Sequence, residues 1–318
     1  MGLLFSTRSA WLLLALAVCL LFLFYLTRPA TRATPGVEVI SRMTAFSGGT
    51  FEASGVVAIA GTDAVLFVDD GRPGLIFWMN LDESGRQAGP IKAIELGVEI
   101  QDLEGATSDG TYFYVVSSQS RPKAAEKAGI VRFKLNTRTQ RVEGAQSIQG
   151  LKSFLVDNVA ELRRMGDVKM KDGGINIEGI AWDPKQNRFL LGLRAPVIDG
   201  QALVIPLRLK NAAGDFSVSN LEVVGSKAIR LNVGGVGIRS IEYDNRQGLF
   251  RIISGAAEDQ EQTDFGLWQW SGDEGGAPPK ELSRYDRRLK PEGAARVTVR
   301  GRDFMFMVFD ASGYSVVE

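Results

Sequence analysis

The chain has 318 residues, 45% of them hydrophobic, so it is long enough to bury a large core. Basic and acidic residues both number 37, and a formal net charge of zero gives no support for nucleic-acid binding. The absence of histidine excludes Ser-His-Asp and Cys-His catalysis and removes the commonest transition-metal ligand. The single cysteine, Cys19, allows no internal disulfide, so any bound metal would be a hard cation held by oxygen atoms.

The first feature in chain order is an apolar run from Trp11 to Leu26 (WLLLALAVCLLFLFYL). This run is slightly short for a membrane-spanning helix and slightly long for the core of a signal peptide. We therefore expect residues 1–28 to be a hydrophobic helix that acts as an uncleaved signal anchor or a removed signal peptide. Either form predicts export: the protein is membrane-anchored and faces the periplasm or the extracellular side, or it is secreted after cleavage. Residues 29–36 (PATRATPG) are interpreted as a linker, and residues 37–318 as the folded domain.

A repeated unit of short strands occupies the folded domain. Its clearest copy, residues 177–196 (IEGIAWDPKQNRFLLGLRAP), contains two apolar strands joined by a turn at Asp183-Pro184. Similar units begin roughly 50 to 75 residues apart, and each has about four strands, the size of a β-propeller blade. The residues that open the five units are Glu52, Glu104, Glu178, Arg239 and Glu292.

The predicted fold class is therefore all-β, a five-bladed β-propeller. Residues Val37–Phe46 (VEVISRMTAF) form a strand without a unit of its own, and the last unit ends before a fourth strand. We expect this N-terminal strand to complete the last blade and close the ring. The insertion Gly150–Asn176 contains a short helical pattern at VAELRRMG and is interpreted as a loop with one helix. Six blades, one of them degenerate and hidden in this insertion, are the alternative, and a two-sheet sandwich is another.

Charged residues recur where the inner strands begin, which in a propeller is one mouth of the central channel. Ser54 is the alternative to Glu52 in the first blade. The ends of the second strands reach the same mouth and bring further carboxylates and an arginine. Converging carboxylates repel one another unless guanidinium groups or a divalent cation compensate them. The sequence thus predicts a polar funnel that either ties the blades together or binds a ligand. The candidate ligand-binding residues are Glu52, Glu104, Glu178, Arg194, Arg239, Glu292, Asp70 and Asp310.

Several of these segments resemble a bacterial family of exported or anchored propellers that is catalogued as a domain of unknown function. The resemblance rests on the EG strand openings and most specifically on GLRAP at Gly192–Pro196 and GIR at Gly237–Arg239. More distantly, Glu178–Asp183 (EGIAWD) is similar to the strand opening of calcium-dependent hydrolases of the gluconolactonase and senescence-marker type. That resemblance implies calcium bound by Glu178 and Glu104. Phytase-like propellers share the EG pattern, and arginines in a funnel suit phosphate or carboxylate substrates.

Two functions follow from these patterns. The first is a binding or interaction module whose Glu/Arg-lined funnel takes a small anionic or sugar ligand, or a protein partner. The alternative is a calcium-dependent hydrolase of ester, lactone or phosphate substrates, in which the metal activates water or a substrate oxygen. The first requires no cofactor and the second requires calcium. The expected partners are thus a small polar ligand or a protein, and a membrane through the N-terminal segment, but not a nucleic acid.

Overall fold

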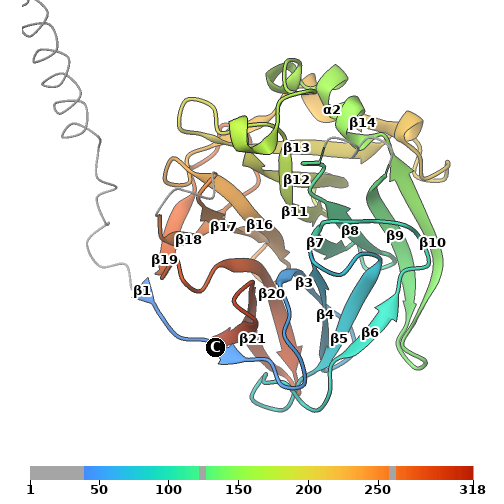
Figure 1. Cartoon of the computed structure of the whole chain (residues 1–318), viewed down its shortest axis with the longest axis vertical. Coiled ribbons are helices and arrows are strands. Elements are labelled where there is room, and N and C mark those ends of the chain that lie inside the picture. Colours follow the sequence, from blue (N-terminus) through green and yellow to red (C-terminus); the bar gives the residue numbers. More distant parts are fainter. Residues whose placement is uncertain (1–38, 122–126, 258–262, 318) are drawn as a thin grey trace, which may run out of the picture. The chain divides into compact units, whose positions relative to one another are not determined.

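Five four- or five-stranded sheets radiate from a common centre in the computed structural model (Figure 1). The structure describes residues 39–121, 127–257 and 263–317. The first strand of each sheet contacts the first strand of the next, and the last of them, β20, contacts β3 of the first sheet. The predicted five-bladed propeller is therefore confirmed, and the six-bladed and sandwich alternatives are not.

The first two blades are regular antiparallel meanders in which strand order follows the sequence. The first contains β3 (Ala53–Ala58), β4 (Ala64–Asp69), β5 (Leu75–Asn80) and β6 (Lys92–Glu95). The second contains β7 (Leu103–Ser108), β8 (Phe113–Ser117), β9 (Ala128–Asn136) and β10 (Arg141–Gln149).

The third blade divides its outer edge between two short strands that both pair with β13. The chain turns between them through η5 (Val224–Ser226), where Gly225 has a φ of 77°. A left-handed residue cannot continue an extended strand, so the pairing is interrupted there. The elements of this blade are β11 (Asn176–Asp183), β12 (Arg188–Ala195), β13 (Ala202–Leu209), η4 (Val218–Asn220), β14 (Leu221–Val223) and β15 (Ile229–Leu231).

The last two blades share the N-terminal segment, which joins their outer edges. The fourth contains β16 (Gly237–Asp244), β17 (Leu249–Gly255), β18 (Phe265–Trp270) and β19 (Lys280–Tyr285). The fifth contains β20 (Pro291–Val299), β21 (Arg302–Phe309) and β22 (Gly313–Val317).

The N-terminal segment closes the ring as two short strands rather than the single predicted one. β1 (Val39–Ile40) pairs in parallel with β19 of the fourth blade, and β2 (Thr44–Ala45) pairs antiparallel with β22 of the fifth. The two blades are separate sheets, so one continuous strand cannot pair with both. The N-terminal segment thus completes the last blade as predicted, but it forms two short strands and not one.

The insertion after the second blade forms one α-helix, but earlier than the sequence pattern indicated. α2 (Leu151–Asn158) precedes the VAELRRMG segment, which forms only the 3₁₀ turn η2 (Ala160–Leu162) before η3 (Met170–Asp172). Leu151 and Leu155 lie one turn apart and are both fully buried, so the helix starts where its apolar face starts.

The N-terminal signal anchor or signal peptide (1–28) and the linker (29–36) lie outside the described residues. Within the described ranges, no helix is long and apolar enough to cross a membrane. Export and membrane attachment therefore stay predictions.

Candidate functional site

A β-bulge lies at the start of each inner strand and turns one side chain out of the regular pairing. In β11, Ile177 pairs with Leu193 and Gly179 with Gly192, which leaves Glu178 as an extra residue without a partner on β12. Bulges commonly re-aim a side chain at the rim of a barrel or channel. The same register shift occurs at Glu104, Arg239 and Glu292.

The glycine after the bulged residue allows the inner strands to approach closely. A Cβ atom on Gly179 would lie 2.9 Å from the backbone nitrogen of Ile241 in the next blade, and one on Gly105 would lie 3.0 Å from that of Ile180. Both distances are shorter than an ordinary van der Waals contact. The Glu-Gly pairs of the sequence therefore combine a polar residue at the channel mouth with a residue that fits between adjacent blades.

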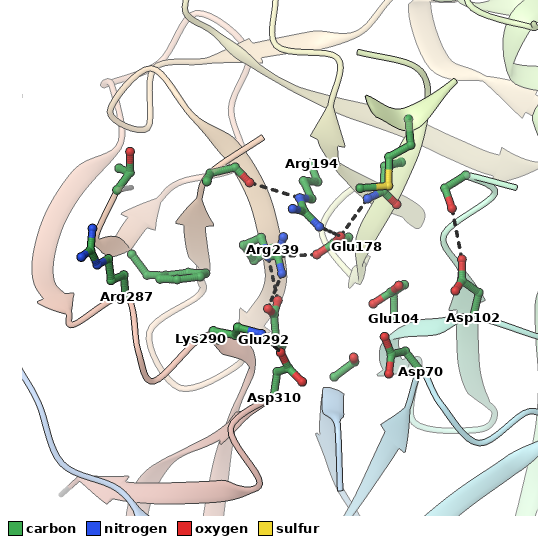
Figure 2. A pocket seen from close by; sticks show the side chains of 17 residues that line it. Asp70, Asp102, Glu104, Glu178, Arg194, Arg239, Arg287, Lys290, Glu292 and Asp310 are labelled. Carbon is green, nitrogen blue, oxygen red and sulfur yellow. Dashed lines mark hydrogen bonds and ion pairs between the residues drawn. The ribbon is translucent and has the colours of Figure 1, made fainter. Parts of the chain in front are cut away.

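The bulged residues line a cavity of about 580 Å³ at one mouth of the channel, hereafter the funnel (Figure 2). Its size is within the usual range of small-molecule pockets. The funnel is lined by Ser54, Asp70, Asp102, Glu104, Ser120, Met170, Asn176, Glu178, Arg194, Arg239, Ala256, Thr263, Phe265, Arg287, Lys290, Glu292 and Asp310.

Seven of the eight predicted site residues line the funnel, and Glu52 does not. Ser54, the alternative in the first blade, lines the funnel in place of Glu52 and is buried. Gly55 shows that Ser54 is the equivalent residue, because a Cβ atom on Gly55 would lie 2.4 Å from the backbone nitrogen of Ala106 in the second blade. Gly55 is therefore the equivalent of the other close-approach glycines, and Ser54 corresponds to their glutamates. Glu52 is exposed and lies two residues before this position.

Glu178 is the centre of an ion-pair network that joins the third and fourth blades. Arg194 Nη1 lies 3.2 Å from Glu178 Oε1, and Arg239 Nε lies 3.0 Å from Glu178 Oε2. Asn176 Nδ2 donates a hydrogen bond of 2.9 Å to Oε1 of the same carboxylate. Arg194 also donates from Nε to the carbonyl oxygen of Ala256, at 3.1 Å. Both carboxylate oxygens of Glu178 are therefore occupied by protein donors.

Arg239 extends the network to the fifth blade. Its Nε donates to Glu292 Oε2 at 2.8 Å, and its Nη2 forms an ion pair with Glu292 Oε1. Burial raises the pKa of Glu292 to about 7, although the neighbouring Arg239 acts in the opposite direction. Burial works against the charge of Arg239, but Glu178 and Glu292 hold its pKa above the ordinary value. Lys290 Nζ and Asp310 Oδ2 form a further ion pair of 2.5 Å.

The first and second blades contribute two carboxylates that form no ion pair with a described residue, Asp70 and Glu104. Glu104 forms no hydrogen bond or ion pair with any of the residues that the structure describes. Burial raises its pKa well above the usual value, and the charges of Glu178, Asp102 and Asp70 raise it further. Burial also raises the pKa of Asp70 to about 7, with contributions from three neighbouring carboxylates. Within the described ranges, Asp70 Oδ1 is buried without a hydrogen-bond partner.

Three lining residues that the sequence analysis missed lie two positions before a ring residue. They are Asp102, Asn176 and Lys290, which precede Glu104, Glu178 and Glu292. Only Asn176 lies in a strand, whereas Asp102 and Lys290 immediately precede β7 and β20 with φ values of 58° and 48°. Strand alternation therefore could not have identified all three. Asp102 is itself paired, since its Oδ1 accepts from Arg121 Nη2 at 3.0 Å.

Met170 and Phe265 are the larger apolar side chains of the wall. Met170 comes from η3 of the insertion, and Phe265 begins β18 in the fourth blade. The guanidinium of Arg239 lies 5.7 Å from the centre of the Phe265 ring. Sequence periodicity does not mark either residue for the funnel, because Met170 lies in a short 3₁₀ helix and Phe265 at the first position of a strand.

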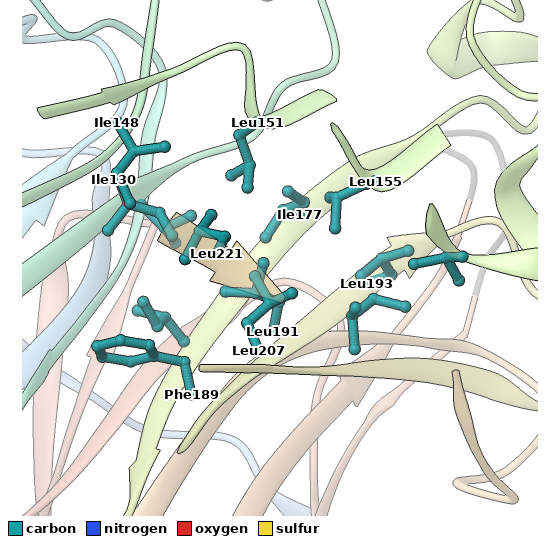
Figure 3. Packing of buried hydrophobic residues seen from close by; sticks show 14 of the residues in the cluster. Ile130, Ile148, Leu151, Leu155, Ile177, Phe189, Leu191, Leu193, Leu207 and Leu221 are labelled. Atoms are coloured by element: carbon teal, nitrogen blue, oxygen red, sulfur yellow. The ribbon is translucent and has the colours of Figure 1, made fainter. Parts of the chain in front are cut away.

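The hydrophobic core behind the funnel supports its charged residues. Ile177 and Leu193, the sequence neighbours of Glu178 and Arg194, are fully buried in one cluster with Leu151 and Leu155 of α2 (Figure 3). Alternate strand residues face opposite sides, so packing of the apolar residues directs the charged ones into the funnel. The helix in the insertion thus packs against the third blade next to Glu178 and Arg194.

Calcium at Glu178 and Glu104 is not favoured by this geometry. Both oxygens of Glu178 already accept from guanidinium groups or an amide, and a divalent cation would lie beside two arginines. The carboxylates close enough to share a metal ion, among the residues that are described, are those of Glu52, Asp69 and Asp70. Asp69 already accepts from the backbone of Glu52 and pairs with Arg72.

A family model matches the part of the chain that contains the centre of the ion-pair network around Glu178. Residues 133–290 match the model of the family described as "Protein of unknown function (DUF3616)". The resemblance to a family of unknown function is thus confirmed over this range, which includes Glu178, Arg194 and Arg239. No curated protein matches the chain.

Solved structures with a similar fold are remote in sequence. One titled "glucose dehydrogenase" is 12% identical, with a TM-score of 0.47, over 87% of this chain and 99% of that one. Sqt1 of Saccharomyces cerevisiae is 9% identical, with a TM-score of 0.37, over 89% and 99%. A chain of the "Mitotic Checkpoint Complex" is 12% identical, with a TM-score of 0.34, over 82% of this chain. This chain spans 60% of that protein's length. Likenesses of this strength carry no functional conclusion.

Proposed function

We propose that the propeller is a binding module whose funnel takes a small, hydroxyl-rich ligand of the sugar class. The observation that carries this proposal is the occupation of the two central guanidinium groups. Arg194 is bound by Glu178 and the Ala256 carbonyl, and Arg239 by Glu178 and Glu292. An anionic ligand would have to displace these buried carboxylates, which costs more than a surface contact returns.

The charge balance of the lining also disfavours an anion. Six acidic and four basic residues line the funnel, and three of the four cations are in ion pairs with its carboxylates. Raised pKa values at Glu104, Glu292 and Asp70 reduce this excess near neutral pH, so the ion pairs of the cations are the stronger argument. Of the two ligand classes that the sequence suggested, the sugar is therefore better supported.

A sugar needs both donors and acceptors in one cavity, together with an apolar surface. The carboxylate of Glu104 offers acceptors, and Ser54 and Ser120 offer hydroxyl groups. Phe265 and Met170 offer apolar surface in the lining of the same cavity. A cavity with a few polar groups converging on an apolar patch is the usual form of a small-molecule site.

The proposal is tested with the purified propeller domain against a panel of neutral mono- and disaccharides by isothermal titration calorimetry. We expect at least one member to bind, and Glu104→Ala to weaken its binding at least fivefold. Glu95→Ala is the matched control, because Glu95 is exposed on the outer strand of the first blade. If no sugar of any kind binds, or if both variants bind like the unchanged protein, the sugar-binding function is rejected.

Export of this module is a separate proposal, supported by the apolar run at Trp11–Leu26 alone. It is tested by expressing the full chain and a chain beginning at Pro29, followed by cell fractionation. We expect the full chain in the membrane or outside the cytoplasm and the shortened one in the cytoplasm. Equal distributions of the two chains would contradict it.

A further inference from the structure

The carboxylates and cations of the funnel are unevenly distributed. Arg194 and Arg239 come from the third and fourth blades, whereas Glu104 and Asp70 come from the second and first and lie apart from them (Figure 2). Glu104 and Asp70 are close enough for their charges to interact. Neither carboxylate forms an ion pair with a described residue, although Arg239 is close enough for its charge to interact with Glu104. The carboxylates on this side of the cavity are therefore not neutralised by ion pairs with described residues.

We propose that Glu104 and Asp70 together bind a protonated amine of the ligand, so that the funnel prefers an amino sugar to the neutral sugar. This inference rests on the proposed function and specifies the ligand class of the same site. An ammonium group has three donors and no acceptor, which matches the carboxylate of Glu104 and the unpartnered Oδ1 of Asp70. Charge-assisted hydrogen bonds of this kind are about twice as strong as neutral ones.

A single positive charge fits this corner better than a metal ion. Among the described residues, Glu104 belongs to no group of three carboxylates that could share a metal ion, and the group that contains Asp70 is completed by Glu52 and Asp69. Ser54, which lies in the first blade beside them, brings a hydroxyl group that can accept from an ammonium group. The ammonium group supplies the missing positive charge without requiring the several oxygen ligands that calcium needs.

Binding of an amine should also release protons, because the charged groups around these two carboxyls are mainly acidic. Asp70 faces Glu52, Asp310 and Asp69, and burial with these charges raises its pKa to about 7. Glu104 faces Glu178, Asp102, Asp70 and Glu292, and the charge of Arg239 also reaches it; burial with the acidic charges still raises its pKa. A bound cation stabilises the ionised forms, so part of the carboxyl population loses its proton on binding.

The test compares D-glucosamine with D-glucose, and 2-amino disaccharides with their neutral counterparts, by calorimetry at pH 7. We expect the amino sugar to bind at least tenfold more tightly. The measured heat should differ between phosphate and Tris buffers by the amount that proton release predicts. Glu104→Gln, which keeps the shape of the side chain, should reduce this preference to less than threefold, while Glu95→Gln should retain it.

Each outcome separates this inference from the proposed function. Equal affinities for the amino sugar and the neutral sugar overturn the amine site but leave sugar binding intact. Circular dichroism shows whether Glu104→Gln is folded. If the folded variant keeps the preference, the amine binds elsewhere and the inference is also overturned. Failure of every sugar, neutral or amino, rejects the proposed function itself.

Discussion

Arg239 and Glu178, on the inner strands of neighbouring blades, form an ion pair of 3.0 Å in which Glu178 is almost fully buried. The same guanidinium binds Glu292 of the following blade. One side chain thus connects three of the five blades at the channel mouth. The sequence predicted charged residues at the channel mouth that either tie the blades together or bind a ligand. Arg239 and its two carboxylates tie blades together.

Arg239→Ala should strongly destabilise the domain. The substitution leaves two buried carboxylates without their shared partner, and removal of one partner from a buried pair typically costs about 3–5 kcal/mol. The free energy of unfolding is measured by urea titration. Arg138→Ala, at an exposed position on the turn of the second blade, is the control and should change it by less than about 0.5 kcal/mol. A loss below about 1 kcal/mol for Arg239→Ala would show that the network does not hold the blades together.

The stability of the domain should fall as the pH rises from about 5 to about 8. Glu292 and Asp70 have folded-state pKa values of about 7, above the ordinary values of 4.5 and 3.8. Between these limits the folded state binds more protons than the unfolded state, so unfolding becomes easier with increasing pH. The charges facing Asp70 come from Glu52, Asp310 and Asp69.

Asp70→Asn should therefore stabilise the domain at pH 8 by about 1 kcal/mol, a figure reduced for solvent screening, and should flatten this slope. Urea unfolding at a series of pH values measures both effects. A slope that is unchanged in Asp70→Asn would show that other groups cause it.

Gly179→Ala should destabilise the domain by about 1–3 kcal/mol, because the added methyl group meets the backbone of Ile241 at 2.9 Å. The strands of the third and fourth blades would have to separate. Thermal unfolding followed by circular dichroism measures the loss. Gly166→Ala is the control, since its nearest atom would lie at 3.7 Å, an ordinary contact. Similar melting temperatures for the two variants would contradict the close-approach role.

Phe46→Ala should weaken the closure of the ring. Phe46 stacks on Phe67 of the first blade at 5.3 Å between ring centres and lies 5.5 Å from Tyr314 of the fifth. Loss of a buried phenylalanine costs about 3–5 kcal/mol. Val39→Ala, at a position that is 51% exposed, should have little effect on urea unfolding. Equal losses of stability in Phe46→Ala and Val39→Ala would show that Phe46 does not hold the ring closed.

Calcium should not raise the melting temperature of the purified domain. Glu178, which the distant hydrolases suggested as a ligand, has both oxygens bound by protein donors. A ligand that binds only the folded state stabilises it, so an increase in melting temperature with calcium would reveal a site. Such an increase would restore the hydrolase alternative, most directly through Glu52, Asp69 and Asp70.

Local patterns were sufficient for the blade repeat and for most of the funnel. Strand alternation, turn residues and the Glu-Gly spacing are properties of short segments, so they identified the five inner strands and the side chains at their starts. The error at Glu52 arose where the first blade lacks the Glu-Gly pair and has Ser54-Gly55 instead. The position of α2 was missed because its apolar face became clear only with the blades on which it packs.

By itself, the sequence determined that the domain is a five-bladed propeller with a polar channel mouth, because strand and turn preferences are local and recur in every unit. Only the tertiary structure decided which charges compensate one another. Arg239 reaches Glu178 and Glu292 across blade boundaries, while Glu104 and Asp70 form no ion pair with any described residue. Pairing between residues so far apart in the chain depends on how closely the blades approach, and the packing of the glycines sets that distance.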